Sequence, residues 1–462
     1  MVIVFLLVTV SVLVAANWYL WRRLFRDTTR APGAARRTGA ALIAGGWVLA
    51  VAALVAERTG APFWLQRTLA WPGFLWLALS IYLLLALLVG EAVRPLLRRW
   101  LERRDRAAAP LVATDVRQPQ PIPAGAPPQE TNAAGATRET GPAEASRGSR
   151  EASGQDTETP EPPEASERPG EPGANSPTDE PSTPSEPTGP SRRLLVSRVV
   201  AGAAAAAAVA TVGHGSYGVL RGPRVKRVTV PLAKLPRGAH GFRIAVVSDI
   251  HLGPVLGRGF AQKVVDTINA TQPDLIAVVG DLVDGSVKDL GPAAAPLAQL
   301  RARHGAYFVT GNHEYFSGAE QWVEEVRRLG LRPLENDRTE LPYFDLAGVN
   351  DVAGEDEGQG PDFVKALGDR DTARACVLLA HQPVQIHDAV EHGVDLQLSG
   401  HTHGGQLWPG NLLAAAANPT VAGLERYGDT QLYVSRGAGA WGPPTRVGAP
   451  SDITVVELAS AR

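Results

Sequence analysis

The sequence predicts an α/β domain that is preceded by transmembrane helices and a disordered linker. Three observations lead to this prediction. Charge-free apolar runs crowd into residues 1–106, and a Pro- and Glu-rich stretch without large apolar side chains follows them. From about residue 225, short apolar runs alternate with helical patterns. A chain of 462 residues is long enough for about two to four domains.

The composition excludes several kinds of site. The formal net charge is −2, which does not favour a general polyanion binder. The chain has one cysteine, Cys376, so it forms neither an internal disulfide framework nor a cysteine-rich zinc or iron–sulfur site. The 10 histidines are ordinary in number, but their placement is not.

Residues 1–106 are predicted to be a membrane domain with three transmembrane helices. The uncharged runs cover residues 1–21, 38–56 and 68–90. Each run is about long enough to cross a hydrocarbon core of roughly 30 Å. Trp and Tyr near the ends of the runs are typical of interfacial anchors. Buried core helices are the alternative, which three such runs in a row disfavour.

The arginines predict the orientation of these helices. The first run has no basic residue before it, so it does not resemble a secretory signal. Arginines cluster after the first run and after the third, whereas the turn between the second and third carries only Arg58 and Arg67. The positive-inside bias therefore places the N-terminus outside and both arginine-rich segments in the cytoplasm.

Residues 107–190 are predicted to be a disordered linker. From Pro123 to Pro190 the chain has no Val, Ile, Leu, Met or aromatic residue. Such a stretch cannot bury enough apolar area to offset its conformational entropy. We interpret it as a spacer, with a docking tail as the alternative.

Residues 191–221 contain a fourth apolar segment. Arg192 and Arg193 precede an Ala-rich run that ends at about Val212. The pattern resembles a twin-arginine export signal, which implies the twin-arginine translocase as a partner. An ordinary fourth transmembrane helix is the alternative. Both interpretations place the remainder of the chain outside the cytoplasmic membrane.

Residues 225–462 form the predicted globular domain. Strand-like apolar runs at residues 242–247, 275–279, 307–309, 376–380 and 396–398 each end in polar residues. Helical patterns at 260–270 and 319–329 lie between the early runs, which gives a β-α-β alternation. Residues at the carboxyl ends of successive strands converge in one crevice of an open α/β sheet.

The polar residues at these strand ends indicate a metal site. They are Asp249, His251, Asp281, Asp284, Asn312, His313, His381, His401 and His403. Carboxylate, amide and imidazole ligands suit Mn, Fe or Zn. Seven of these nine residues as ligands would be too many for one ion. They fit two divalent ions about 3.5–4 Å apart that share a carboxylate. The other five histidines, His214, His240, His304, His387 and His392, are interpreted as surface or structural residues.

Together the motifs resemble the five-block signature of the calcineurin-like metallophosphoesterases. The blocks are Asp249-x-His251, Gly280-Asp281-x-x-Asp284, Gly311-Asn312-His313-Glu314, His381 and Gly400-His401-x-His403. The stretch from Leu398 to Gln406 resembles the YkuE/YaeI-like, membrane-associated branch of that superfamily. The resemblance covers residues 225–462 and implies a four-layer α-β-β-α sandwich.

The resemblance also implies a role for each site residue. The implied metal ligands are Asp249, His251 and His403 for one ion, Asn312, His381 and His401 for the other, and Asp281 as the bridge. His313 would stabilise or protonate the leaving oxygen, and Asp284 would orient His313. Gly285 stands where the protein-phosphatase branch has an arginine that grips phosphate, which argues against a protein Ser/Thr phosphatase.

The predicted function is that of a membrane-anchored, binuclear-metal phosphoesterase acting outside the cytoplasm. Two cations lower the pKa of a bridging water towards roughly 7, so that hydroxide attacks phosphorus in line. The expected substrate is a phosphomonoester, a phosphodiester or a lipid-linked pyrophosphate of the cell envelope. A non-catalytic metal-binding receptor or scaffold is the alternative. No nucleic acid is expected as a partner, because residues 240–462 show no basic patch interleaved with aromatics.

Overall fold

The computed structural model describes residues 2–108 and 192–461. Residues 1–106 and 190–462 belong to one compact unit. That unit contains both the helices of the N-terminal part and the C-terminal domain. The predicted linker, residues 107–190, lies outside the described residues apart from its first two.

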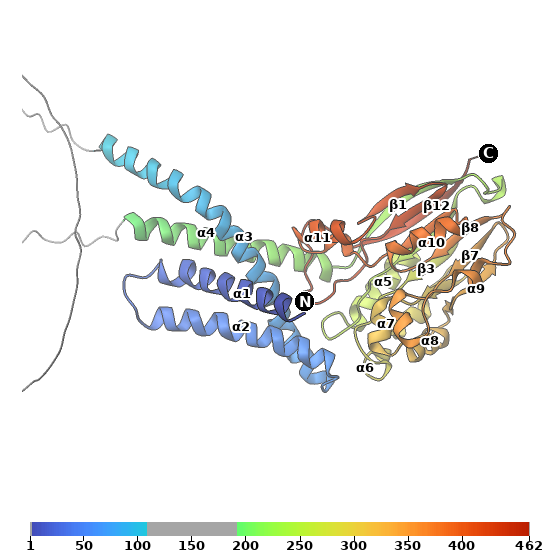
Figure 1. The fold of residues 1–462 in the computed structure, drawn as a ribbon, viewed down its shortest axis with the longest axis horizontal. Coiled ribbons are helices and arrows are strands. Elements are labelled where there is room, and N and C mark those ends of the chain that lie inside the picture. Colours follow the sequence, from blue (N-terminus) through green and yellow to red (C-terminus); the bar gives the residue numbers. More distant parts are fainter. Residues whose placement is uncertain (1, 109–191, 462) are drawn as a thin grey trace, which may run out of the picture. The chain divides into compact units, whose positions relative to one another are not determined.

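The predicted apolar runs fold as helices (Figure 1). They are α1 (Val2–Trp21), α2 (Ala34–Arg58), α3 (Phe63–Ala108) and α4 (Arg192–Leu220), and a short π-helix, η1 (Arg22–Arg26), continues α1. Within the described residues, three helices are long and apolar enough to cross a membrane, at 34–58, 63–104 and 192–220. They correspond to the second, third and fourth predicted segments. That α1 also crosses the membrane stays a prediction.

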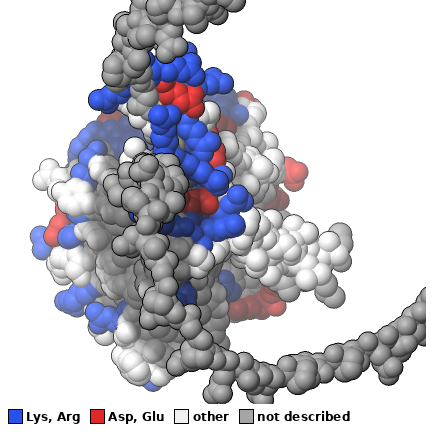
Figure 2. All heavy atoms as spheres, turned by 90° about the vertical axis from the view of Figure 1, so that its left-hand side faces the viewer, with Lys and Arg blue, Asp and Glu red and all other residues white. Residues whose placement is uncertain are grey.

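The arginine-rich ends of these helices lie together. Trp21 Nε1 of α1 donates a hydrogen bond to the Arg36 carbonyl at the start of α2, at 3.0 Å. Arg198 Nε of α4 donates to the Thr28 carbonyl in the turn between α1 and α2, also at 3.0 Å. The end of α3 and the start of α4 meet in one pocket, lined by Arg98, Arg192 and Arg193 among others. Figure 2, which faces this end, shows Lys and Arg side chains gathered there.

The C-terminal domain contains two six-stranded sheets. The first has the order β1-β12-β2-β3-β4-β5. Its strands are β1 (Arg224–Leu232), β2 (Phe242–Val247), β3 (Leu275–Val279), β4 (Ala306–Val309), β5 (Arg332–Pro333) and β12 (Asp452–Ser460). The second has the order β10-β11-β9-β8-β7-β6. Its strands are β6 (Asp337–Glu340), β7 (Phe344–Gly348), β8 (Ala375–Leu379), β9 (Leu396–Ser399), β10 (Gly423–Tyr427) and β11 (Thr430–Val434).

Helices connect and cover the strands. The α-helices of the domain are α5 (Arg258–Ala270), α6 (Val287–Ala294), α7 (Asn312–Ser317), α8 (Ala319–Arg328), α9 (Phe363–Leu367), α10 (Ile386–Glu391) and α11 (Gly410–Ala417). Short 3₁₀ segments are η2 (Arg237–Ala239), η3 (Ala295–Gln299), η4 (Val352–Glu357), η5 (Pro383–Gln385) and η6 (His403–Gly405). The helical patterns predicted at 260–270 and 319–329 correspond to α5 and α8.

Three apolar clusters separate four layers. Between the sheets, Ile244 of β2 belongs to the same buried cluster as Leu346 of β7. On the other face of the first sheet, the cluster includes Trp322 of α8. On the other face of the second sheet, Leu378 of β8 shares a cluster with Ile386 of α10. The α-β-β-α sandwich that the resemblance implies is confirmed.

The parallel pairing of strands determines where the predicted site lies. Strands β2, β3 and β4 pair in parallel in the first sheet, as do β7, β8 and β9 in the second. Their carboxyl ends therefore lie at one edge of each sheet. The polar segments that follow five of these strands carry the predicted site residues.

Candidate metal centre

The structure brings all of the predicted site residues together. Asp249 and His251 follow β2, Asp281 and Asp284 follow β3, Asn312 and His313 begin α7 after β4, His381 follows β8, and His401 and His403 follow β9. The first three segments come from one sheet and the last two from the other. The site therefore depends on the packing of the two sheets against each other.

One cluster of candidate ligands is formed by Asp249, His251, Asp281 and His403. All four are buried, and their ligand atoms lie within 4.8 Å of one another. His251 Nε2 lies 3.0 Å from His403 Nε2, and His403 Nε2 lies 3.4 Å from Asp249 Oδ1. Ring nitrogens that face each other between carboxylates form a donor set suited to a divalent transition metal.

A second cluster is formed by Asp281, His381 and His401. Asn312 adds an amide oxygen, because its Oδ1 lies 3.0 Å from His401 Nδ1. Asp281 is thus a member of both clusters. This sharing is the arrangement expected of a carboxylate that bridges two ions.

The ring of His381 shows that this second cluster fits a metal ion. Its Nδ1 lies 2.9 Å from the Val279 carbonyl oxygen, which can only accept a hydrogen bond, so Nδ1 carries the proton. Its Nε2 is buried, has no hydrogen-bond partner and lies 3.2 Å from Asp281 Oδ2, so it is the ring nitrogen left to bind a cation. A cation between Nε2 and the carboxylate would satisfy both groups.

Asp284 contacts two histidines with one oxygen. Its Oδ1 lies 2.8 Å from Nδ1 of His251 and 2.8 Å from Nδ1 of His313. Burial alone would lower the pKa of His313, but the hydrogen bond and charge of Asp284 outweigh it and raise the pKa to about 9. Burial likewise opposes ionisation of Asp284, but His251 and His313 lower its pKa to about 2. The contact with Asp284 therefore favours the charged form of His313.

The site residues have unusual backbone conformations. Left-handed φ angles occur at Asp249 (52°), His251 (48°), Asp281 (53°), His401 (72°) and His403 (53°). Only a few per cent of non-glycine residues adopt this region, with Asn, Asp and His enriched among them, and it persists where surrounding contacts enforce it. Gly437 also has a positive φ, and a Cβ there would lie 2.6 Å from the Asp249 Cβ. Such strain concentrates at functional sites.

Glu314 organises the site, a role that the sequence did not assign. Its buried carboxylate accepts hydrogen bonds from the backbone N–H groups of Asp281 (2.9 Å), Leu282 (2.8 Å) and Gly311 (2.6 Å). It therefore fixes the segment after β3 to the start of α7. The signal was present, because a Glu three residues after the N-cap Gly311 can reach back to the N-cap N–H.

Arg446 is a second organising residue that the sequence did not reveal. It is buried, and its Nη1 donates to the His403 carbonyl at 3.0 Å. Its Nη2 lies 3.1 Å from His403 Nδ1, and its Nε donates to the Gly439 carbonyl at 2.6 Å. No sequence pattern marks this residue, because it lies 43 positions after His403.

Aromatic side chains form the rim of the site. The rings of Phe316 and Trp441 lie 5.6 and 5.7 Å from the ring of His313, and both side chains are exposed. The guanidinium of Arg58, at the end of α2, lies 5.4 Å from the centre of the Phe316 ring. The rim therefore includes a contact with a membrane helix.

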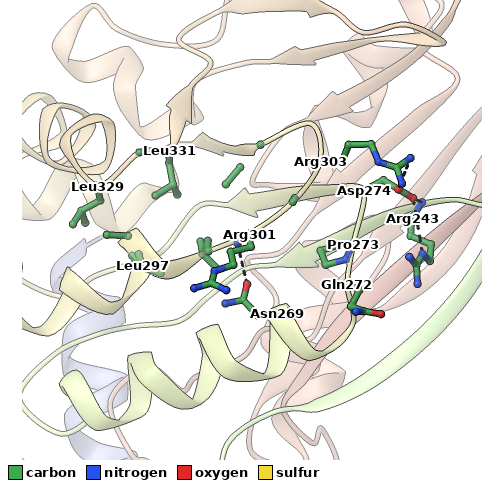
Figure 3. Close-up of a pocket in the computed structure, with 16 residues that line it drawn as sticks. Arg243, Asn269, Gln272, Pro273, Asp274, Leu297, Arg301, Arg303, Leu329 and Leu331 are labelled. Atoms are coloured by element: carbon green, nitrogen blue, oxygen red, sulfur yellow. Dashed lines mark hydrogen bonds and ion pairs between the residues drawn. The ribbon is translucent and has the colours of Figure 1, made fainter.

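A separate cavity of about 870 Å³ lies away from this site (Figure 3). Asp274, just before β3, accepts a hydrogen bond from the Arg243 backbone N–H at 2.9 Å, and its carboxylate lies 3.5 Å from Arg303. The lining segments precede β3, β4 and β5, so they mark the amino ends of these strands. None of the predicted ligands lines this cavity.

Comparisons with known proteins match the part of the chain that carries the predicted site residues. Residues 242–405 match the calcineurin-like phosphoesterase family. The chain is 39% identical over 263 residues to a "Transmembrane protein with metallophosphoesterase domain" from Danio rerio, covering 54% of this chain and 60% of that protein. It is 35% identical over 240 residues to an "Uncharacterized metallophosphoesterase" from Aquifex aeolicus, covering 51% of this chain and 91% of that one.

A third relative matches a larger share of this chain. It is the "Uncharacterized metallophosphoesterase YkuE" of Bacillus subtilis, 30% identical over 280 residues, with 58% of this chain and 98% of that protein covered. The two bacterial proteins are matched over nearly their whole length, whereas the Danio rerio protein is matched over only 60% of its own. Since both bacterial relatives share the domain that holds the clustered ligands, the chain belongs to the metallophosphoesterase family.

Proposed function

We propose that this protein is a membrane-anchored phosphoesterase that uses two divalent metal ions. The observation that carries the proposal is the membership of Asp281 in both clusters of candidate ligands. One shared carboxylate between two otherwise separate ligand sets supports two ions rather than one.

The residues divide between the two ions as the resemblance implies. Asp249, His251 and His403 would hold one ion, Asn312, His381 and His401 would hold the other, and Asp281 would contact both. Mn, Fe and Zn suit these oxygen and imidazole ligands. When bound, the ions would supply the Lewis acidity that activates water for attack on phosphorus at neutral pH.

His313 acts on the leaving group. Its Nδ1 is occupied by Asp284 at 2.8 Å, so Nε2 is the ring nitrogen left to donate a proton. The raised pKa of His313, about 9, keeps that proton in place at neutral pH. Donation to the leaving oxygen offsets the negative charge that develops there as the ester bond breaks. Asp284 positions the ring and holds its charge.

We place the catalytic domain at the outer face of the cytoplasmic membrane. Support comes from the arginine-rich ends of α1, α3 and α4, which lie together, as they would on one side of a membrane. Support also comes from α4, whose Ser216 hydroxyl lies 2.7 Å from that of Thr445 in the domain. Helix α4 has buried residues from Leu194 to Val219, which favours a permanent anchor. Export by the twin-arginine translocase remains part of the proposal.

The substrate in this proposal is a phosphate ester at the membrane surface, with a lipid-linked phosphate as the favoured class. The contact of Arg58 with the rim residue Phe316 supports it, because this arginine ends a helix that is long and apolar enough to span the membrane. The outward-facing rim therefore lies close to where lipid headgroups would be.

Metal analysis of the full chain in detergent tests the function. After supplementation with Mn²⁺, we expect close to two ions per chain, and hydrolysis within a panel of phosphomonoesters, phosphodiesters and pyrophosphates. Chelation should abolish hydrolysis, and Mn²⁺ should restore it. One ion or none after supplementation, or hydrolysis that survives chelation, would contradict the proposal.

A further inference from the structure

The helix that follows the metal ligands is apolar and exposed. Helix α11 has no buried residue, and the side chains of Leu412 and Leu413 are 65% and 77% exposed. Trp408, just before it, is 52% exposed. Residues 404–424 carry no charged side chain at all. Adjacent exposed apolar side chains of this kind usually mark a surface that something covers.

This exposed helix adjoins the membrane helices. Tyr82 of α3 donates a hydrogen bond from its hydroxyl to the Trp408 carbonyl at 3.0 Å. Leu407 packs against the apolar cluster that α1, α2, α3 and α4 share. The surface of α11 is therefore continuous with helices that are apolar enough to cross a bilayer.

The same helix is coupled to the metal centre by short contacts. His403 begins η6, and a Cβ on Gly405 of that segment would collide with the backbone of Asn411 in α11. Gln406 exchanges hydrogen bonds with the backbone of Trp441, at 2.9 and 3.1 Å. Trp441 in turn packs on His313. The position of α11 therefore fixes the position of the rim.

We propose that α11 and Trp408 insert into the interfacial layer of the lipid bilayer. The insertion holds the mouth of the metal site at the level of the headgroups, where a lipid-linked phosphate ester is presented. The proposal rests on the proposed function for that substrate, but the insertion itself does not need it. An apolar helix with a neighbouring Trp is typical of interfacial segments.

Two features favour lipid over a protein as the occupant. The exposed residues of α11 are Leu412, Leu413 and the three alanines at 415–417, and none of these side chains offers a hydrogen-bond donor or acceptor to a protein partner. Protein interfaces also have a polar rim, but the uncharged stretch extends from 404 to 424, beyond both ends of the helix. A bilayer takes up the apolar face of an interfacial helix and needs no charged partner.

Spin labelling of the full chain in lipid nanodiscs tests the insertion. Cys376 is the only native cysteine and is buried, so Leu413→Cys provides a single exposed labelling site. We expect that label to collide with oxygen, which partitions into lipid, and to be shielded from a water-soluble nickel chelate. The control is Glu324→Cys on α8, whose side chain is 74% exposed, and its label should show the reverse.

Two outcomes would overturn the insertion. Ready access of the nickel chelate to the Leu413→Cys label would place α11 in water. Shielding from both oxygen and nickel would place it against protein, such as a second copy of the chain. Each result is independent of whether the protein hydrolyses anything.

A comparison of two substrates tests the link to the metal site. Leu413→Gln should lower turnover of a phosphate ester carried on a vesicle lipid by about fivefold to tenfold, because α11 loses apolar contact with the bilayer. Turnover of soluble p-nitrophenyl phosphate should stay unchanged. Val364→Gln, at a valine that is 71% exposed on α9, is the matched control.

The outcomes separate the inference from the proposed function. Equal turnover of the vesicle ester by Leu413→Gln and Val364→Gln would show that α11 has no role in presenting the substrate. Absence of hydrolysis of both substrates by the unaltered protein, loaded with Mn²⁺, would instead sink the proposed function.

Discussion

Asp284 Oδ1 lies 2.8 Å from Nδ1 of His313. The same oxygen lies 2.8 Å from Nδ1 of His251, a candidate metal ligand. One carboxylate therefore supports both the metal cluster and the proton donor. The resemblance implies only the contact with His313, so the contact with His251 enlarges the expected effect of changing Asp284.

Asp284→Asn should lower both kcat and metal affinity. The amide keeps the shape of the side chain but removes the charge that keeps His313 protonated. Loss of a carboxylate behind a ligating histidine typically costs about 10–100-fold in metal affinity. Metal titration, followed by kcat measured at saturating Mn²⁺, checks both effects. A kcat equal to that of the unaltered protein would refute the role of Asp284 in holding His313 charged.

His313→Ala should leave the metal content nearly intact while lowering kcat. Removal of one donor to the transition state typically costs about 2.7–4 kcal/mol, or about 10²–10³ in rate. Elemental analysis and steady-state kinetics on the same preparation check the prediction. His381→Ala is the matched control, because it removes a ligand candidate and should lose metal. Loss of an ion from His313→Ala would make His313 a ligand instead.

Glu314→Gln should destabilise the domain without removing a candidate ligand. The carboxylate accepts from Asp281 and Gly311 through Oε2 and from Leu282 through Oε1. An amide has only one acceptor oxygen, so at least one buried N–H loses its partner, which costs about 1–3 kcal/mol.

Denaturant unfolding of the metal-free protein measures that loss. Glu324→Gln, at an exposed side chain of the same layer of helices, should change the free energy of unfolding by about 0.5 kcal/mol or less. Equal stability of the two variants would show that the hydrogen bonds of Glu314 contribute nothing.

The thiol of Cys376 should be unreactive in the folded protein. Burial raises its pKa to about 12, from an ordinary value of 9.0. At pH 8 the folded chain therefore holds almost no thiolate, which is the nucleophilic form, and access to the buried sulfur is blocked as well. A thiol-reactive dye should label the chain only in denaturant. Complete labelling of the native protein within minutes would contradict this prediction.

Protease added to intact protoplasts should digest residues 225–462 and spare the 107–190 linker. The reason is the positive-inside bias of the arginine-rich ends, which places the linker in the cytoplasm. Immunoblots against the two regions measure the outcome, and the reverse pattern would overturn the orientation.

The export route is tested separately. Arg192→Lys combined with Arg193→Lys keeps the charge but removes the guanidinium pair that a twin-arginine receptor would read. Blocked export would support that route, and unchanged export would leave an ordinary fourth transmembrane helix.

The predicted site residues lie together in the structure, and the sequence could point to them because their signal is local. Each candidate follows an apolar run directly, and parallel pairing of strands such as β2 and β3 brings those ends together. The position of β12 between β1 and β2 was not predicted from the sequence. These partners lie more than 200 positions earlier in the chain, and the periodicity of apolar residues does not say which strands pair. Arg446 was missed for the same reason, since its contact with His403 exists only once the chain folds back.

The position of β12 has a consequence for the timing of folding. In chain order it follows every other described strand, yet it lies between β1 and β2, parallel to one and antiparallel to the other. The ribosome releases β12 after all of the other described strands, so the first sheet cannot close before residues 452–460 have emerged. Until then the facing edges of β1 and β2 stay unpaired, and an unpaired strand edge is open to pairing with another chain.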